Sequence, residues 1–390
     1  MADSALVYMS DSLDEHHIQN GFGSQPVPER AFRERIKVVG VGGGGNNALD
    51  HIIRSGIEGV EFLAVNTDAH CLDKCLSVEK LVLGERLTRG LGAGARPEVG
   101  EQAAIESRED LRTCLKGCDM VYLAAGMGGG TGTGALPVIA DVAREMGILT
   151  VAVVTRPFTF EGKRRKNFSD EGIERLKRSV DALIIVPNDR LLKLSERTTS
   201  LTDAFAMADD VLRQAVQGVT DLVTRPGKIN VDFADLRSIM KHAGGAVMGI
   251  GVGKGEHRTE EALQRAMESP LMESSIKGSK GVILNITADP TVGIMELQSA
   301  AMTLQEQIDP EAVFIWGQVD DESMGDEVQM VVIATGFDLE SVSDAPAQPG
   351  QVIQQNMMMP PPVPEKSVTD SLFSMESPID MPAYLRRKKA

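Results

Sequence analysis

One short segment, residues 126–134, constrains the fold of this chain more than any other. It holds six glycines and two threonines in nine residues, it follows the apolar run 120–124, and it precedes a helix-like segment that starts at Ala135. A backbone with so few side chains can bring its N–H groups close to an anion, and the following helix adds the positive end of its dipole. Thr131 and Thr133 add hydroxyl donors. The segment therefore predicts a cradle for a polyphosphate.

Strand-like and helix-like segments alternate through the first half of the chain. The expected strands are residues 36–41, 60–65, 120–125, 148–154 and 182–186, and helix-like segments lie at 97–115, 136–146 and 172–179. Runs this continuously apolar are typical of strands covered on both faces, so the alternation predicts an α/β fold with a mostly parallel sheet. Ligands of such sheets bind beyond the carboxyl ends of the strands, where the glycine-rich segment lies.

The pattern changes after a long helix-like stretch, residues 201–223, which ends at the helix breaker Pro226-Gly227. Four strand-like runs (246–253, 281–287, 312–319, 327–337) and two helix-like runs (259–267, 294–305) follow. They predict a smaller α+β domain on a mixed or antiparallel sheet. We therefore expect a first, Rossmann-like domain at residues 34–224, which includes the long helix, and a second domain at 225–337.

The two ends of the chain differ in composition from the domains. Residues 1–33 are polar and acidic, and the region from 338 to 380 is rich in proline and poor in aromatic residues. We expect a disordered N-terminal extension at 1–33 and a disordered linker at 338–376, because such segments cannot bury enough apolar surface to fold. The final residues, 377–390, combine Pro382, Tyr384 and Leu385 with a basic cluster, which is typical of a docking peptide.

Charge and hydropathy exclude two classes of partner. The chain carries 56 acidic and 40 basic residues and a formal net charge of −16, whereas a general nucleic-acid binder presents a basic face. No apolar run approaches the roughly 20 residues that a membrane-spanning helix needs. We expect no nucleic-acid partner, no direct insertion into a membrane, and a location in the cytoplasm.

A second glycine-rich segment, residues 40–48, directly follows the first expected strand. A single G-x-G-x-x-G match here would suit a dinucleotide-binding fold, so a Rossmann oxidoreductase stays open as an alternative. Two points weigh against it. The strand that should supply a ribose-binding acid ends in Asn66-Thr67-Asp68, and a dinucleotide does not need a second glycine segment. Two such segments favour a mononucleotide with several phosphates.

Several motifs together carry a family resemblance. They are GVGGGGNNA at 40–48, NTD at 66–68, LTRGLGAGARPEVG at 87–100, GGGTGTG at 128–134, TRPFTFEGKRR at 155–165, NVDFAD at 230–235 and DMPAYLR at 380–386. In this order they resemble the tubulin-type GTPase superfamily and, within it, the FtsZ family of bacterial cell-division proteins. The resemblance implies a tubulin-like fold, in which a parallel-sheet GTP-binding domain is joined by a long core helix to a smaller α+β domain.

The resemblance also implies a site for GTP or GDP, with Mg²⁺ accompanying the nucleotide. The residues at matching positions are Gly43, Gly44, Gly45, Asn46, Asn47, Gly130, Thr131, Gly132, Glu161, Arg165, Phe205 and Asp209. The first eight match phosphate loops, the next two match contacts to the sugar, and the last two would stack on the purine and accept from guanine. From the residues alone, the i,i+4 spacing of Glu161 and Arg165 favours a helix ion pair instead. The residues alone likewise favour a core phenylalanine at position 205 and a solvated carboxylate at Asp209.

The expected catalytic residues are Asn230, Asp232 and Asp235. Taken alone, Asp232 would suit a helix N-cap and Asp235 the first helical turn. The resemblance implies a different role, in which this loop reaches the nucleotide of the next subunit in a filament. The carboxylates would there polarise the water that attacks the γ-phosphate. No metal site built from protein side chains is expected.

The resemblance thus predicts a GTPase that hydrolyses GTP to GDP and phosphate, polymerises head to tail, and forms the contractile ring at the bacterial division site. Its partners would be further copies of itself and membrane-attached division adaptors, which would bind residues 377–390. It would lie in the cytoplasm at mid-cell, beneath the inner membrane. A non-hydrolysing structural filament and a tubulin-like filament GTPase with a role outside division remain alternatives.

Overall fold

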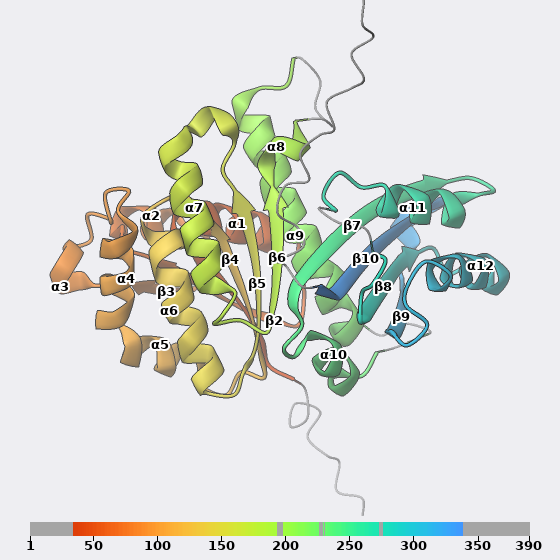
Figure 1. Ribbon diagram of the computed structural model, residues 1–390, viewed down its shortest axis with the longest axis horizontal. Coiled ribbons are helices and arrows are strands. Elements are labelled where there is room, and N and C mark those ends of the chain that lie inside the picture. Colours follow the sequence, from red (N-terminus) through yellow and green to blue (C-terminus); the bar gives the residue numbers. More distant parts are fainter. Residues whose placement is uncertain (1–33, 193–197, 226–228, 230, 273–275, 338–390) are drawn as a thin grey trace, which may run out of the picture. The chain divides into compact units, whose positions relative to one another are not determined.

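The structure is a computed structural model, and it describes residues 34–192, 198–225, 229, 231–272 and 276–337 (Figure 1). Five of the predicted features lie outside the described residues: the extension 1–33, the helix breaker Pro226-Gly227, Asn230, the linker 338–376 and the docking peptide 377–390.

A sheet of ten strands runs through the described residues, in the order β3-β2-β1-β4-β5-β6-β7-β10-β8-β9. The strands are β1 (Ile36–Val41), β2 (Val60–Asn66), β3 (Glu79–Val82), β4 (Met120–Gly126), β5 (Leu149–Arg156), β6 (Ala182–Pro187), β7 (Gly244–Lys254), β8 (Gly281–Ala288), β9 (Val313–Asp320) and β10 (Glu327–Phe337). Neighbours from β3 to β7 are parallel, β10 is antiparallel to β7 and β8, and β8 is parallel to β9. The predicted α/β class, with a mostly parallel sheet followed by a mixed one, is confirmed.

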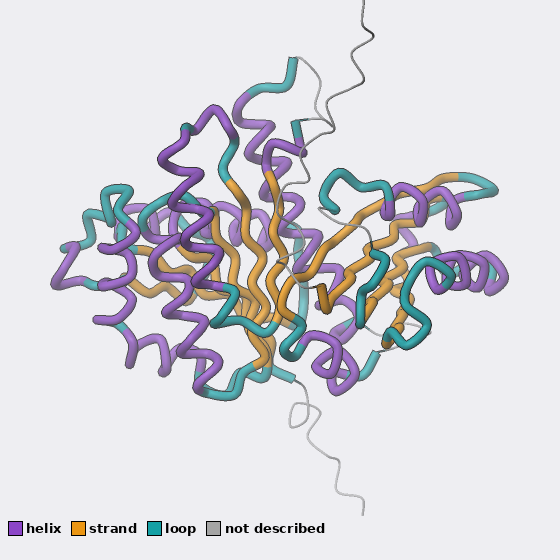
Figure 2. The backbone as a smooth tube through the Cα atoms, viewed as in Figure 1, coloured by secondary structure: helices purple, strands orange, loops and turns teal. Residues whose placement is uncertain are grey.

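The helices pack around these strands, as Figure 2 shows. They are α1 (Gly42–Arg54), α2 (Ala69–Lys74), α3 (Glu85–Thr88), α4 (Pro97–Glu106), α5 (Arg108–Leu115), α6 (Thr131–Glu145), α7 (Lys163–Leu176), α8 (Asn188–Leu191), α9 (Leu201–Thr224), α10 (Phe233–Met240), α11 (Arg258–Met267) and α12 (Ile294–Gln305), with short 3-10 turns η1 (Thr159–Glu161) and η2 (Glu322–Met324). None of the helices in the described ranges is long and apolar enough to cross a membrane.

Alternation along the strands divides the interior into separate cores. In β4, Met120 and Tyr122 belong to a core shared with α1 and α9, while Val121 and Leu123 belong to a core shared with α4, α5, α6 and α7. Successive strand residues point to opposite faces, so a strand buried on both sides must be apolar throughout. A third core lies between α11, α12 and the strands β8 and β10.

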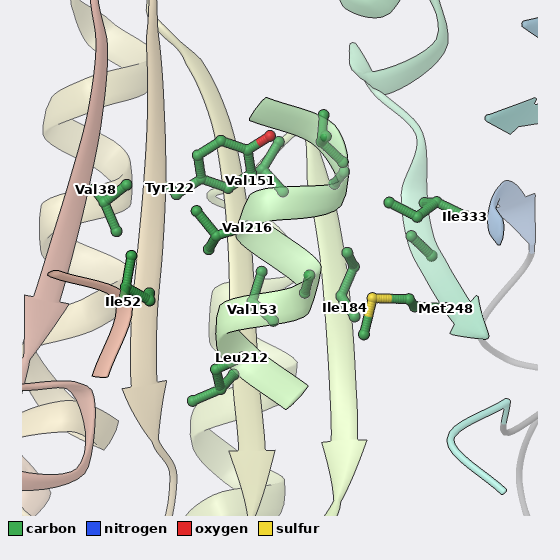
Figure 3. Packing of buried hydrophobic residues seen from close by; sticks show 14 of the residues in the cluster. Val38, Ile52, Tyr122, Val151, Val153, Ile184, Leu212, Val216, Met248 and Ile333 are labelled. Carbon is green, nitrogen blue, oxygen red and sulfur yellow. The ribbon is translucent and has the colours of Figure 1, made fainter. Parts of the chain in front are cut away.

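The long helix α9 connects the two halves of the sheet. Figure 3 shows its Leu212 and Val216 against β5, while Met248 of β7 and Ile333 of β10 extend the same core into the second half. Gly218 lets α9 lie close to β10, because a Cβ at position 218 would already be 3.0 Å from Cγ1 of Val331 on that strand. The predicted core helix is therefore confirmed as the element against which both halves pack.

Several predicted boundaries were wrong, and the glycine segments are the most informative case. We expected the segment 126–134 to precede a helix that starts at Ala135, but α6 already begins at Thr131, and α1 begins at Gly42, inside the segment 40–48. Glycine has a low intrinsic helix propensity, which tertiary packing overrides here. A Cβ on Gly45 would lie 2.2 Å from the carbonyl oxygen of Ala124, so no larger residue fits this helical turn.

Other boundaries differ for local reasons. The helix predicted at 97–115 is two helices that meet at Ser107, whose Oγ accepts from the N–H of Gly84 at 3.0 Å. The helix predicted at 172–179 spans Lys163–Leu176 instead. Strand β3 was missed because it is a four-residue edge strand that contains Glu79 and Lys80, and charged edge strands lack the apolar signal of central ones.

Replacing Gly134 with alanine should lower the free energy of unfolding by about 2–3 kcal/mol, because overpacking against backbone atoms cannot be relieved by a rotamer change. The added Cβ would lie 1.9 Å from the carbonyl oxygen of Pro97 on α4. Chemical denaturation of the nucleotide-free protein measures this loss. Gly129→Ala is the matched control, since its Cβ would meet no atom within 4 Å. An equal loss in both variants would contradict the packing argument.

Candidate functional site

Two helix N-termini meet at the carboxyl ends of the neighbouring strands β1 and β4. Helix α1 begins directly after β1, α6 begins five residues after β4, and Val41 pairs with Ala125 across the two strands. The N–H groups in the first turn of a helix lack intrahelical partners, and neither helix has an acidic residue in its first turn. This edge of the sheet, which we call the anion edge, is therefore suited to hold phosphates.

Glycine allows the two helix ends to approach each other. Gly42 has a φ of 71°, and a Cβ there would lie 2.9 Å from the backbone nitrogen of Gly132. Gly43 and Gly44, the next residues of α1, are exposed to solvent. The predicted phosphate-binding residues are thus brought together: Gly43, Gly44 and Gly45 in the first turn of α1, Gly130 at the N-cap of α6, and Thr131 and Gly132 in its first turn.

Asn46 is a buried amide that lacks a protein partner. It is 3% exposed, and neither Oδ1 nor Nδ2 has a hydrogen-bond partner in the described part of the chain. An unsatisfied buried polar group costs about 1–3 kcal/mol, so a polar ligand is the natural partner for this amide. Asn47, the next residue, is exposed.

The two threonines of the glycine segment have different surroundings. The Oγ1 atoms of Thr131 and Thr67 lie 2.7 Å apart, which places the Asn66-Thr67-Asp68 segment at the anion edge. Thr133 Oγ1 accepts from the N–H of Gly128 at 2.8 Å and so holds the turn between β4 and α6.

Glu161 and Arg165 follow β5, the next strand along this edge. Arg165 Nη1 donates to Glu161 Oε2 at 2.7 Å, so the ion pair expected from the spacing is present. The start of α7 also lies against the turn after β4, since a Cβ on Gly128 would be 2.8 Å from the carbonyl oxygen of Arg165. The Arg165 side chain is 52% exposed and remains accessible to a ligand.

Phe205 and Asp209 project from the first turns of α9. Phe205 is 40% exposed and meets the ring of Phe158 edge to face, with centroids 5.3 Å apart, so it is not a core phenylalanine. Asp209 is not a freely solvated carboxylate either. Burial raises its pKa from 3.8 to about 6, against the opposing effect of His51 on α1. A desolvated carboxylate beside a partly exposed ring suits an aromatic base with N–H donors.

The sequence-based prediction missed Asn188. This residue follows β6, begins α8 and is 3% exposed, and its Oδ1 has no hydrogen-bond partner among the residues that the structure describes. Its position directly after a predicted strand, at the edge where ligands bind, was the available signal.

The candidate residues follow the order of the strands. The phosphate-binding candidates lie after β1 and β4, Glu161 and Arg165 after β5, and Asn188 after β6. At about 4.8 Å per strand, β1 and β6 lie about 14 Å apart. An elongated ligand with an anionic end at α1 and α6, and an aromatic end at β6 and α9, fits this arrangement.

Asp232 and Asp235 are not part of this arrangement. Both are exposed at the start of α10, and α10 is attached near the amino end of β5, where Arg237 Nη2 donates to the carbonyl oxygen of Gly147 at 3.1 Å. At about 3.3 Å per residue, β5 alone separates them from the anion edge by roughly 25 Å. Figure 1 shows α10 at the lower edge of the view and α8 at the upper edge. Asp232 occupies the N-cap position of α10, but its side chain makes no cap hydrogen bond.

Comparison with known proteins shows which family has this fold. The model of the Tubulin/FtsZ family, GTPase domain, matches residues 35–196, and that of the FtsZ family, C-terminal domain, matches residues 244–338. An FtsZ dimer from M. jannaschii is 41% identical, with a TM-score of 0.76, and the match covers 80% of this chain and 90% of that one. A mutant FtsZ from M. jannaschii is also 41% identical, with a TM-score of 0.75 and coverages of 78% and 92%.

A more distant structure shares the fold. CetZ2 from Haloferax volcanii, in a GTPγS-bound protofilament, is 18% identical, with a TM-score of 0.67, and the match covers 79% of this chain and 96% of that one. With its two family models and its identity to FtsZ, this chain belongs to the Tubulin/FtsZ family of GTPases, in the FtsZ branch, and its GTPase domain binds guanine nucleotide.

Proposed function

We propose that this protein is a GTPase that assembles head to tail, with each nucleotide held by one copy and hydrolysed with help from the next. One observation supports this proposal above the others. The anion edge and the exposed pair Asp232 and Asp235 lie at opposite ends of the same parallel strands. The N–H donors of the anion edge and the two carboxylates of one chain therefore cannot reach the same phosphate. Stacking copies along the strand direction would bring the two together.

The anion edge would bind the phosphates through backbone N–H groups of Gly43, Gly44 and Gly45 on α1, and of Gly130, Thr131 and Gly132 at the start of α6. Asn46 and Asn47 would add amide donors beside them. Glu161 and Arg165 would contact the sugar. Phe205 would stack on the base, and Asp209 would accept from the N1–H and N2–H₂ groups that distinguish guanine from adenine.

Mg²⁺ would enter with the nucleotide. In the described residues no group of three or more His, Cys, Asp or Glu is arranged to hold a metal ion. Phosphate oxygens and water suit this ion better than a dedicated protein cage, and its charge would offset that of the phosphates. The chain's own part would be to orient the phosphates against these N–H donors.

Asp232 and Asp235 of the adjacent copy would orient and polarise the attacking water. Both carboxylates are exposed at the start of α10 and face outward from their own chain. We include Asn230 as a third member of this group, on the family resemblance of the segment 230–235. The dimer of M. jannaschii FtsZ and the protofilament of Haloferax volcanii CetZ2 support assembly of copies as the setting.

The cellular role that we propose is the contractile ring of bacterial division, in the cytoplasm at mid-cell beneath the inner membrane. The segment DMPAYLR at 380–386 supports this role, because a peptide that docks division adaptors has little use elsewhere. A filament GTPase with a role outside division is the alternative, and it would not need this peptide.

Asp235→Ala should leave GTP binding and assembly close to wild type but lower phosphate release by about 100-fold or more, the usual scale for losing a group that moves or orients a proton. Pelleting and phosphate release in the same reaction measure both effects. Ser238→Ala on the same helix is the control, because Ser238 is exposed and donates only to the carbonyl oxygen of Asp235, at 2.7 Å. Full turnover by dilute, unassembled wild-type protein would refute the shared site.

Affinity for GTP should fall about tenfold between pH 7 and pH 5, because a carboxyl group with a pKa of about 6 can accept from both guanine N–H groups at once only when it is ionised. Equilibrium binding of GTP across this range measures the loss. Asp209→Asn should bind weakly at pH 7 and show a flat profile. A wild-type profile that is equally flat would exclude Asp209 as the guanine acceptor.

The stability of the nucleotide-free protein should respond in the opposite direction. The folded state holds the Asp209 proton more tightly than the unfolded state does. The contribution of the protonated Asp209 to the free energy of unfolding is therefore lost as pH rises from 3.8 to about 6. Asp209→Asn should therefore raise the free energy of unfolding at pH 7 by roughly 2–3 kcal/mol. Asp210→Asn is the control with the opposite sign: burial raises the pKa of Asp210, but the hydrogen bonds and the charge of its neighbours, chiefly Arg213, outweigh burial and lower this pKa overall.

Deleting residues 377–390 should leave GTPase activity and assembly intact but abolish recruitment to membranes by the division adaptor. A pull-down with a membrane-attached adaptor, run beside the full chain, measures this. Unchanged adaptor binding would remove the support for the division role and favour the alternative.

A further inference from the structure

Three consecutive residues of α8 have side chains with three different surroundings. Asn188 Oδ1 is buried at the base end of the candidate site without a partner in the described part of the chain. Asp189 Oδ1 accepts from the N–H of Thr159 at 2.8 Å, which ties α8 to the turn η1 that carries Glu161. Arg190 Nη1 donates to two carbonyl oxygens of the second half, those of Pro270 at 3.1 Å and Met272 at 2.7 Å.

The acceptor segment of Arg190 is firmly anchored. Leu271, between the two acceptor residues, is 6% exposed and belongs to the core that α9 shares with both halves. Met272 lies against β7, where a Cβ on Gly249 would be 2.9 Å from its sulfur atom. Arg190 therefore connects a helix of only four residues to a well-packed segment.

The pairing of the strands explains why α8 needs this support. β6 and β7 pair over three residues, and the last pair is Ile184 with Ala246. Beyond that point β6 continues to Pro187 without β7 beside it, and Figure 1 shows the two strands diverging. The end of β6, from which Asn188 follows, thus lacks sheet pairing on the side of the second half. Arg190 supplies a connection there through its side chain.

We propose that Arg190 is a positioning residue for nucleotide binding, which holds the amide of Asn188 against the base by fixing α8 to the segment 270–272. The second half would then contribute to affinity for a nucleotide that it does not itself contact. The ligand class is a purine nucleotide whose N–H donor satisfies Asn188 Oδ1. This inference rests on the nucleotide site proposed above.

The test is a double-mutant cycle on the full chain, with dissociation of a fluorescent GDP analogue from dilute, unassembled protein as the readout. Arg190→Ala should speed dissociation about tenfold, the loss expected for one buried hydrogen bond. Asn188→Ala should have a comparable effect. The double variant should dissociate no faster than Asn188→Ala alone, because Arg190 acts through Asn188. Arg190→Lys should restore most of the wild-type rate, since an ammonium can also donate to both carbonyl oxygens.

Arg175→Ala is the matched control. This arginine donates to Glu101 at 2.7 Å within the first half, so its loss should leave the rate unchanged. A wild-type rate in Arg190→Ala, or the same fold-change from this substitution with and without Asn188, would overturn the proposal. Failure of the wild-type chain to bind GDP in this assay would instead overturn the nucleotide site, and with it this inference.

Discussion

The unpartnered N–H groups at the starts of α1 and α6 are the feature on which the rest of the structure depends. Two helix dipoles can point at one place only if their backbones approach closely, and the contacts around Gly42, Gly45 and Gly132 leave no room for a Cβ. The cost of so much glycine is conformational entropy, which the buried strands β1 and β4 offset. The proposed phosphate binding and the packing of the first half would therefore both depend on the same close contact.

Parallel strands give the sheet two chemically different edges. The carboxyl edge gathers helix N-termini and suits anions, whereas the amino edge near Gly147 carries α10 with its exposed acids. An exposed acid pair directly beside the phosphates would repel them in a resting chain. Placing Asp232 and Asp235 at the far edge avoids this repulsion, and under the proposed function it would make hydrolysis depend on a neighbouring copy. In this interpretation, assembly and turnover are coupled by electrostatics and strand length together.

The two halves of the sheet are connected by few contacts. The halves are connected at different positions along the strands. The contacts are three paired residues of β6 and β7, the buried face of α9 and the side chain of Arg190. A short strand pairing fixes one end and leaves the nucleotide end to side-chain contacts. Asp209 and Asn188 lie at that end, and both carry a desolvation cost that a bound base would relieve.

The amino-acid sequence by itself determined the central strands, the long core helix, the α/β class and the two glycine segments, because buried strands must be apolar on both faces and close backbone approach requires glycine. Motifs such as GGGTGTG pointed to the family. Only the tertiary structure decided that these glycines form helical turns, since local propensity argues against it and the contact with Ala124 overrides it. It also decided the burial of Asp209, the unpartnered amide of Asn188 and the distance of Asp232 from the anion edge. These depend on which elements pack together across long sequence separations, and no local pattern carries that information.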